Sequence, residues 1–247
     1  MHDEQSNDLI RFVTEPSPCP YLETESAQLE YRVPARLETE SLERLLERGW
    51  RRFGNYVFRP KCQACRKCRP LRIVLDEFSP SKSQRKALRR NDQIEIFVTQ
   101  PCVTDEHVAL FNLYHRNMAE LRDWPENVTS FQDYYESFIG RPFDFAREFQ
   151  YRKDGRLIGI GIVDVLEEGL SSVYFYHDPA WRKLSPGTFS ILTEIEWAKS
   201  NSLKYSYLGY WIHENQSMDY KARFTPHQLL EACVDFDEEP VWVLATD

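Results

Sequence analysis

The sequence predicts an α+β protein, with a strand-rich first part and a strand–loop–helix–strand unit in the second part. A chain of 247 residues with 42 % apolar and 28 % charged side chains can bury a core without disulfides. Alternating apolar residues at Ile94, Ile96 and Val98 indicate a strand, whereas apolar residues spaced by three and four over 189–199 indicate a helix. A helix between two strands is typical of a single parallel crossover.

The first part begins with a proline-rich segment over residues 1–20, which we expect to be poorly ordered. An amphipathic helix is predicted over 42–48, where Gly49 ends it. A loop with three cysteines follows, and then a basic helix that ends near Asn91. Pro101 is a plausible boundary between the two parts. The strands expected here cover 51–60, 71–75 and 94–98.

The second part is predicted to contain a β-hairpin at Asp154-Gly155, a dipeptide that favours tight turns between strands. We therefore divide the chain into an N-terminal domain over 1–100, with the cysteine loop and basic helix, and a C-terminal domain over 101–247. The other elements expected in the second part are helices over 107–117, 131–139 and 189–199 and strands over 149–152, 157–165, 172–177, 205–211 and 241–244.

Composition excludes several protein classes. No apolar run approaches the roughly 20 residues of a membrane-spanning helix. The acidic start of the chain lacks the pattern of a secretory signal. We therefore expect a cytoplasmic protein whose six cysteines are free or metal-bound rather than disulfide-linked.

The whole chain has a net charge of −8, but residues 59–90 contain eleven Lys or Arg and two acidic residues. One basic segment on an acidic body indicates an anionic partner at one place, although a solvated charged helix is the alternative.

Three cysteines occur at the spacing Cys62-x-x-Cys65-x-x-Cys68. This spacing lets neighbouring thiolates reach one metal ion. Cys19 is the candidate for a fourth ligand, and the set would suit a structural zinc ion or an iron–sulfur cluster. The alternative interpretation is three reduced cysteines in a turn.

The basic helix places its cations on one face, since they recur at three- and four-residue spacings. Such a face can follow a phosphate backbone.

The loop over 178–188 precedes a helix, and its cations would suit an anion at that helix start; a plain connection is the alternative. Tyrosines over 207–224 indicate either a core strand or a stacking surface. The candidate nucleic-acid contacts are Lys82, Arg85, Lys86, Arg89, Arg90, Arg182 and Lys183.

Taken together, these segments resemble the arginyl-tRNA–protein transferase family, and within it the bacterial branch of aspartate/glutamate leucyltransferases. The resemblance spans about residues 15 to 235. The matching strings are Cys19-Pro-Tyr-Leu22, Arg51 to Pro60, the cysteine loop from Cys62 to Pro70, Ser81 to Asn91, Tyr174 to Pro179, Leu184 to Leu192, Tyr207 to Ile212 and Tyr220 to Phe224.

The resemblance implies transfer of leucine from leucyl-tRNA to the amino terminus of proteins that begin with Asp or Glu, which marks them for degradation through the N-degron pathway. It also implies an N-acetyltransferase-like (GNAT) fold for the second half. The sequence departs from the eukaryotic branch, because Leu22 stands where a second early cysteine would be and the loop cysteines are not adjacent. The alternatives are arginine as the transferred residue, an acyl-CoA N-acetyltransferase, and a non-catalytic RNA-binding module.

The implied reaction needs little acid–base chemistry, because the ester is activated and the acceptor amine has a pKa of roughly 8. We expect positioning to supply most of the rate, without any cofactor in the chemistry. Asp178 and Tyr210 are the candidates for assisting the proton transfer, and a thioester on Cys68 is the covalent alternative. The sequence does not locate the pocket for leucine.

Recognition of an acidic first residue requires cations, and arginine binds a carboxylate through two hydrogen bonds. Arg59 and Arg69 lie on either side of the cysteine loop, in strings shared with the family. They are our candidates for this role, with Lys61 and Arg72 as neighbours that could substitute. A structural ion pair is the alternative for each.

Overall fold

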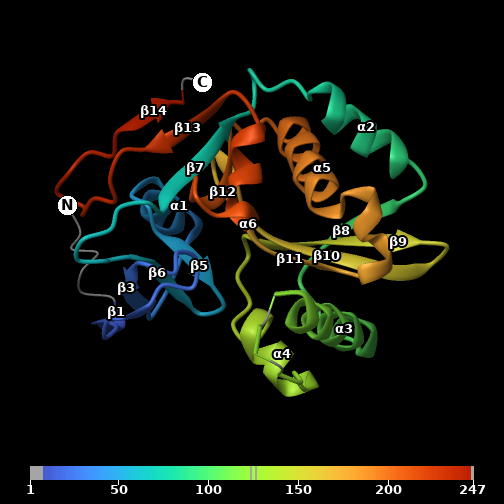
Figure 1. The fold of residues 1–247 in the computed structure, drawn as a ribbon, viewed down its shortest axis with the longest axis horizontal. Helices are drawn as coiled ribbons and strands as arrows, with labels where there is room; N and C mark the ends of the chain where they lie inside the picture. Colours follow the sequence, from blue (N-terminus) through green and yellow to red (C-terminus); the bar gives the residue numbers. More distant parts are fainter. Residues whose placement is uncertain (1–7, 123, 126, 246–247) are drawn as a thin grey trace.

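The computed structural model describes residues 8–122, 124–125 and 127–245. Its centre is an eight-stranded mixed sheet in the order β14-β13-β7-β12-β11-β10-β9-β8 (Figure 1). Within this sheet β11 and β12 are parallel, and the other neighbouring pairs are antiparallel. The strands are β7 Arg69–Val74, β8 Glu95–Thr99, β9 Ala146–Lys153, β10 Arg156–Val165, β11 Gly169–His177, β12 Tyr205–Trp211, β13 His227–Leu230 and β14 Trp242–Leu244.

A four-stranded sheet in the order β1-β4-β6-β5 lies beside one end of the large sheet (Figure 1). The single strand predicted over 51–60 is wrong, because Gly54, with φ +53, turns the chain between two paired strands. The smaller sheets contain β1 Asp8–Val13, β4 Leu29–Pro34, β5 Arg51–Phe53 and β6 Tyr56–Pro60, and the pair β2 Ser17–Pro18 and β3 Ser26–Ala27.

The poorly ordered segment expected over residues 1–20 is also corrected in its described part. Strand β1 pairs along β4, and this pairing is supported by side chains as well as backbone. Arg11 donates to the carboxylate of Glu30, and the rings of Phe12 and Tyr31 stack at 5.2 Å. Residues 1–7 lie outside the described residues.

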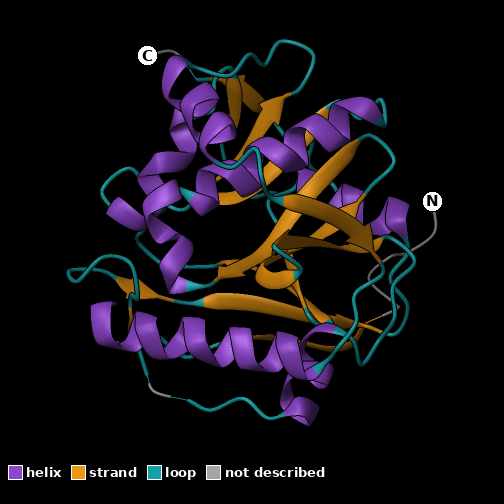
Figure 2. Ribbon diagram, turned by 90° about the vertical axis from the view of Figure 1, so that its right-hand side faces the viewer, coloured by secondary structure: helices purple, strands orange, loops and turns teal. Residues whose placement is uncertain are grey.

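Helices cover both faces of the large sheet. Helices α2 and α5 pack on one face, while α3 and α4 lie on the other (Figures 1 and 2). The helices predicted near these positions are confirmed, and the loop expected after β11 contains a 3-10 helix. The bounds are α1 Thr39–Glu47, α2 Lys82–Arg90, α3 Asp105–Arg122, α4 Phe131–Phe138, η2 Pro179–Leu184, α5 Pro186–Ser200, α6 Gln216–Asp219 and η3 Tyr220–Arg223.

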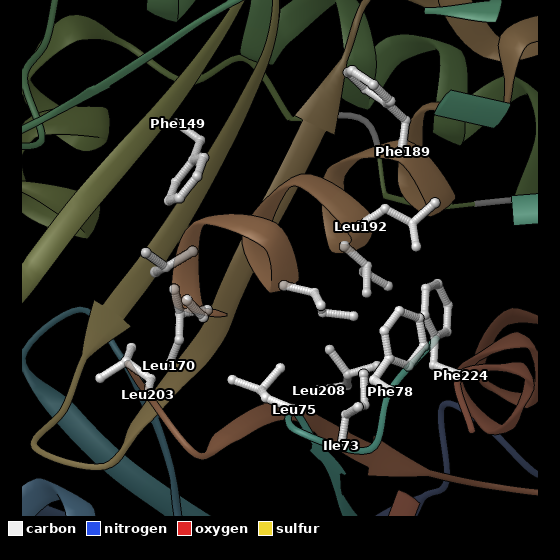
Figure 3. Close-up of a cluster of buried hydrophobic side chains, with 14 of the residues drawn as sticks. Ile73, Leu75, Phe78, Phe149, Leu170, Phe189, Leu192, Leu203, Leu208 and Phe224 are labelled. Carbon is white, nitrogen blue, oxygen red and sulfur yellow. The ribbon is translucent and has the colours of Figure 1, made fainter. Parts of the chain in front are cut away.

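The main core lies between α5 and the sheet (Figure 3). Phe189 and Leu192 of α5 pack in one cluster with Phe149, Leu170 and Leu208 of the strands. Each such buried side chain contributes about 1.5–3 kcal/mol, so the crossover β11–α5–β12 is firmly held. The α+β class and its mixed sheet are therefore confirmed.

Strands from both parts of the sequence share this sheet, because β7 pairs with β12 on one side and with β13 on the other. The division of the chain at residue 100 stays a prediction. None of the helices in the described ranges is both long enough and apolar enough to cross a membrane.

Candidate active site

A cavity opens where β11 and β12 separate. Parallel pairing ends at Ser171 and Tyr207, although β11 continues to His177 and β12 to Trp211. The space between them, covered by α5 and by the α6–η3 segment, encloses about 230 Å³, and we call it the central cavity. Gaps at the carboxyl ends of parallel strands are common ligand sites. Its lining includes apolar Val173, Phe175, Ile191 and Leu208 and the ionisable Arg51, Glu194, Tyr210 and Lys221.

Glu194 is a buried carboxyl group in the wall of the central cavity, on α5, where only 3 % of it is exposed. It accepts hydrogen bonds from the hydroxyls of Ser172 and Ser190, the latter at 2.9 Å. Gly161 on β10 gives it room, since a Cβ there would lie 3.3 Å from its Oε1. Burial raises the pKa of Glu194 to about 7, so near neutral pH this carboxyl group can either donate or accept a proton.

Lys221 places an amine in the same cavity. Its Nζ donates to the carbonyl of Tyr210 at 2.8 Å. Burial and, to a smaller extent, the nearby Arg51 guanidinium lower the pKa of Lys221 to about 7. A substantial fraction of this amine is therefore neutral near pH 7, when it can accept a proton.

Arg51 is held rigidly in the wall by β11. Its guanidinium donates to the hydroxyl of Ser171 at 3.2 Å and to the carbonyl of Ser172. Gly209 lets it approach β12, because a Cβ there would lie 3.1 Å from the guanidinium and the backbone φ is +77. The cavity thus combines a fixed cation with two groups that change protonation near neutral pH.

The two residues predicted to assist proton transfer lie in different places. Tyr210 lines the central cavity, but its hydroxyl donates to the carbonyls of Gly49 and Phe58 at 2.9 and 3.2 Å. Burial raises the pKa of Tyr210 well above its usual value. Asp178 does not line the cavity among the described residues; it begins η2, where it accepts from the backbone of Ala180 and from Arg156.

A second cavity of about 340 Å³ lies between the cysteine loop and the residues after β13, and we call it the cysteine-loop cavity. Three of the four residues predicted to bind the acceptor line this cavity: Arg59, Lys61 and Arg69. Arg72 is separated from them, since its guanidinium lies 3.8 Å from the ring centre of Tyr205 and 4.4 Å from that of Trp242.

The three predicted acceptor-binding cations that line the cysteine-loop cavity differ in their availability, and Arg66 is a fourth cation in its lining. Arg59 is 2 % exposed and donates to Glu30, to Asp235 and to the carbonyl of Val234. Lys61, by contrast, has a 51 % exposed side chain, and Arg69 is half-buried with its Nε 3.4 Å from the carbonyl of Leu230. Lys61 and Arg69 are therefore the cations better placed to meet a ligand.

The cysteines predicted as metal ligands gather near the same cavity. Cys62, Cys65 and Cys68 line it together with Cys233. Burial raises the pKa of Cys68 to about 12, and neighbouring thiols, including Cys19, raise it as well. In the part of the chain that the structure describes, no three of the predicted ligand sulfurs lie within 4.8 Å of one another. Metal binding by this set stays a prediction.

The basic helix α2 begins with a capping box between Ser81 and Gln84, which satisfies backbone groups at its start. Gln84 and Ala87 are buried, and all five cations are exposed. The C-terminal end of α2 contacts η2, because Arg90 donates to the carbonyl of Lys183 at 2.8 Å. We call the exposed cations of α2 and η2 the cationic face; they are Lys82, Arg85, Lys86, Arg89, Arg90, Arg182 and Lys183. Arg182 is directed toward α3, because its guanidinium donates to Asn117 at 2.7 Å.

A smaller hollow lies between α2 and the start of α5. Its lining includes Ser83 and Gln84 from α2 and Thr188 from α5. Tyr220 lines both this hollow and the central cavity, so the two are neighbours. Helix α2 thus borders a hollow beside the central cavity, while its cations are on its exposed side.

Sequence reasoning missed Glu194, Lys221 and Arg51. One signal was available, because Glu194 interrupts an apolar helix face between Ile191 and Ile195. Lys221 and Arg51 stand in the strings Tyr220 to Phe224 and Arg51 to Pro60, which resemble the family. Those strings do not predict burial in a cavity, since the burial depends on strands that are distant in the chain.

Comparisons with known proteins identify the family of the chain. The family model of the arginine-tRNA-protein transferase N terminus matches residues 17–86, and that of the C terminus matches residues 106–231. The aspartate/glutamate leucyltransferase of Helicobacter hepaticus is 37 % identical over 234 residues, which cover 95 % of this chain and 97 % of that protein. The aspartate/glutamate leucyltransferase of Saccharophagus degradans is 35 % identical over 226 residues, which cover 90 % of this chain and 94 % of that protein.

Solved structures are more distant. L-PGS from Bacillus licheniformis matches with a TM-score of 0.46 and 14 % identity, covering 71 % of this chain and 51 % of that one. FemX matches with a TM-score of 0.43 and 9 % identity, covering 81 % and 79 %. The two family models and the similarity over nearly the whole length of the curated relatives show that the chain belongs to the arginine-tRNA-protein transferase family.

Proposed function

We propose that this protein transfers leucine from leucyl-tRNA to the N-terminal Asp or Glu of acceptor proteins, and so marks them for degradation in the N-degron pathway. The names of the curated relatives support leucine over arginine or an acyl-CoA donor. The observation that carries the proposal is the central cavity, which holds Glu194 and Lys221, both with a pKa of about 7. The reaction would occur in the cytoplasm, where charged tRNA is available.

The cationic face would bind the acceptor stem of the tRNA. Its exposed cations match a phosphate backbone, and the hollow between α2 and α5 shares Tyr220 with the central cavity. Backbone N–H groups at the start of α5 add a partial positive charge on this route. The terminal ribose and its ester would enter the cavity from this side, and the apolar residues of the lining would surround the leucine side chain.

The acceptor would approach from the cysteine-loop cavity. Lys61 and Arg69 are our choice for binding the acidic side chain, since Arg59 is already paired with Glu30 and Asp235. The strand pairing of Arg69 with Trp211 and of Pro70 with Tyr210 keeps this cavity next to the central one. The acceptor amine then lies near the ester.

In the chemical step, the acceptor nitrogen attacks the ester carbonyl carbon, and the bond to the ribose oxygen breaks. The neutral amine of Lys221 accepts the proton that the attacking nitrogen loses. Protonated Glu194 donates a proton to the departing ribose oxygen. A new amide bond and a free ribose hydroxyl result, and no metal or redox group takes part in these steps. General acid–base assistance of this kind is worth about 10²–10⁴-fold.

The test offers the purified protein four donor preparations: labelled leucyl-tRNA, arginyl-tRNA, free leucine and acetyl-CoA. Each is combined with peptides that begin with Asp, Glu or Lys and share the remaining sequence. We expect label to appear only on the Asp and Glu peptides, and only from leucyl-tRNA. Transfer from acetyl-CoA, or equal transfer to the Lys peptide, would contradict the proposal.

A further inference from the structure

Three potential metal-ligand side chains meet near the β8 edge of the large sheet. None of them lines the central cavity or the cysteine-loop cavity. Cys102 lies between β8 and α3, His107 in the first turn of α3, and Glu148 on β9. His107 and Glu148 are 1 % and 0 % exposed. Within the described ranges, these three residues are the one group of at least three Cys, His, Asp or Glu side chains whose ligand atoms all lie within 4.8 Å of one another.

The spacing of these atoms is close to that around a tetrahedral metal ion. The Cys102 sulfur lies 3.8 Å from His107 Nε2 and 3.9 Å from Glu148 Oε1, and the latter two atoms are 3.0 Å apart. A zinc ion holds sulfur at about 2.3 Å and nitrogen or oxygen at about 2.0–2.2 Å, so its ligand atoms lie about 3.4–3.6 Å from one another. Shifts of about half an ångström in each side chain would complete the geometry.

One atom of the cluster lacks the contact that its burial requires. Glu148 Oε2 is buried and has no hydrogen-bond partner among the described residues. An unsatisfied buried carboxylate oxygen is costly, and in native proteins such an atom calls for a water or an ion. The fully buried carboxylate is therefore independent support for a cation at this place.

The surrounding side chains orient the cluster as the outer residues of metal sites do. Thr104 Oγ1 lies 2.6 Å from His107 Nδ1, which directs Nε2 toward Cys102 and Glu148. The amide nitrogen of Gln150 faces Glu148 Oε1 at 2.8 Å and the Cys102 sulfur at 3.9 Å. Arg152 donates to the oxygen of the same amide. This fixes the Gln150 N–H groups toward the two atoms that become anionic when they bind a metal.

A nucleophilic role explains the cluster less well. The Cys102 sulfur lies 3.9 Å from the carboxylate of the buried Glu148 and has no lysine or arginine as a hydrogen-bond partner among the described contacts. Catalytic thiols instead lie beside a cation or a helix start. Thiolate, imidazole and carboxylate together are a donor set that suits zinc.

We propose that Cys102, His107 and Glu148 form a structural site for a zinc ion, with Glu148 Oε2 or a water molecule as the fourth ligand. The ion would join the start of α3 to β9 and so fix the helix that covers one face of β10 and β11 (Figure 1). The half-buried Cys102 gives the ion a route from solvent. This site is separate from the cysteines near the cysteine-loop cavity.

The test strips the full-length protein with a chelator and then titrates it with zinc or cobalt. We expect one equivalent of metal to bind, a thiolate-to-cobalt charge-transfer band to appear, and zinc to raise Tm by several degrees, because it binds the folded state. Cys102→Ser should abolish the charge-transfer band and lower zinc affinity at least tenfold. Glu148→Gln, which keeps the shape of the side chain, should lower zinc affinity similarly and serves as the second variant, with folding checked by circular dichroism.

Cys62→Ser is the matched control, since it removes another half-buried cysteine from a different cluster. It should retain the cobalt band and the zinc-dependent rise in Tm. A wild-type protein that binds no metal would overturn the proposal. Metal that is lost in Cys62→Ser and retained in Cys102→Ser would also overturn it, and would assign the metal to the cysteine loop.

Discussion

Replacing Lys221 with methionine should make the protein more stable at neutral pH and at the same time nearly inactive. Burial and the nearby Arg51 lower the pKa of Lys221 from 10.5 to about 7. The unfolded chain therefore binds a proton here between pH 7 and 10.5 that the folded chain does not. Stability rises with pH over this window, because the unfolded state binds more protons. The cost to the folded state is largest at and below pH 7.

The gain in the free energy of unfolding follows from the difference between the pKa of Lys221 in the unfolded and folded states. A lowering from 10.5 to about 7 corresponds to roughly 5 kcal/mol, at about 1.4 kcal/mol per pH unit. Solvent screening of a half-buried side chain reduces this figure to about half, and the lost hydrogen bond to Tyr210 offsets about 1 kcal/mol more. We therefore expect Lys221→Met to raise the free energy of unfolding by about 1–2 kcal/mol near pH 7 and by less near pH 10.

Urea unfolding at several pH values measures the stability, and single-turnover transfer from leucyl-tRNA measures the chemistry. The rate should fall by about 10²–10⁴-fold, as expected for loss of a proton acceptor. Lys221→Arg should not restore it, because a guanidinium stays protonated at neutral pH. The exposed Lys153 provides the control, and Lys153→Met should change stability by less than about 0.5 kcal/mol. An unchanged pH dependence of stability, or an unchanged single-turnover rate, would refute the reasoning.

Three further predictions concern the other parts of the site. Glu194→Gln should stabilise the protein at pH 8 but not at pH 4, because a raised pKa of about 7 costs the folded state stability as pH rises from 4.5 through 7; urea unfolding at the two pH values checks this, and equal effects would contradict it. The double variant Lys86→Glu and Arg89→Glu should weaken tRNA binding at least tenfold and flatten its salt dependence, as filter binding at several salt concentrations would show. Lys61→Ala should raise KM for an Asp peptide with little change in Tm. Arg59→Ala should instead destabilise the fold by about 1–3 kcal/mol, because Glu30 and the half-exposed Asp235 lose a partner while Arg11 still pairs with Glu30; peptide kinetics and thermal melting separate the two variants.

The basic helix α2 could be predicted because its signal is local. The capping residue Ser81, the sparse apolar positions and the spacing of the cations are all read from eleven consecutive residues. The helix–strand order around α5 was predictable for the same reason. Periodicity reports a structure well when one face of the element is apolar and the other is polar.

Strand β4 shows where that reasoning fails. Its buried positions include Glu30 and Arg32, which are 3 % and 5 % exposed. These charges are neutralised by partners far along the chain: Glu30 by Arg11 and Arg59, and Arg32 by Asp8. Leu29, Tyr31 and Val33 alternate with these charges, so the pattern itself is that of a strand. It fails because it would place the charged positions in solvent, whereas the structure buries them as ion pairs.

The catalytic pair proposed here was unpredictable for a related reason. Glu194 and Lys221 acquire a pKa near 7 only because the strands β11 and β12 separate and α5 closes over the gap. Neither the separation nor the closure is a property of the residues beside them. The interrupted apolar face around Glu194 could have raised it as a candidate, but not its role.

The pairing of strand β7 explains how the central cavity can receive groups from both the tRNA and the acceptor protein. It begins at Arg69, directly after the cysteine loop, and pairs with β12 so that Arg69 lies opposite Trp211 and Pro70 opposite Tyr210. The carbonyl of Tyr210 in turn accepts the hydrogen bond from Lys221. The loop that we assign to the acceptor and the amine that we assign to the proton transfer are therefore fixed by adjacent residues of two paired strands. Helix α5 packs on β11 and β12, and α2, which carries most of the cationic face, packs against α5. A transferase built in this way brings its two substrates together across a single strand, which requires the first and second parts of the chain to share one sheet.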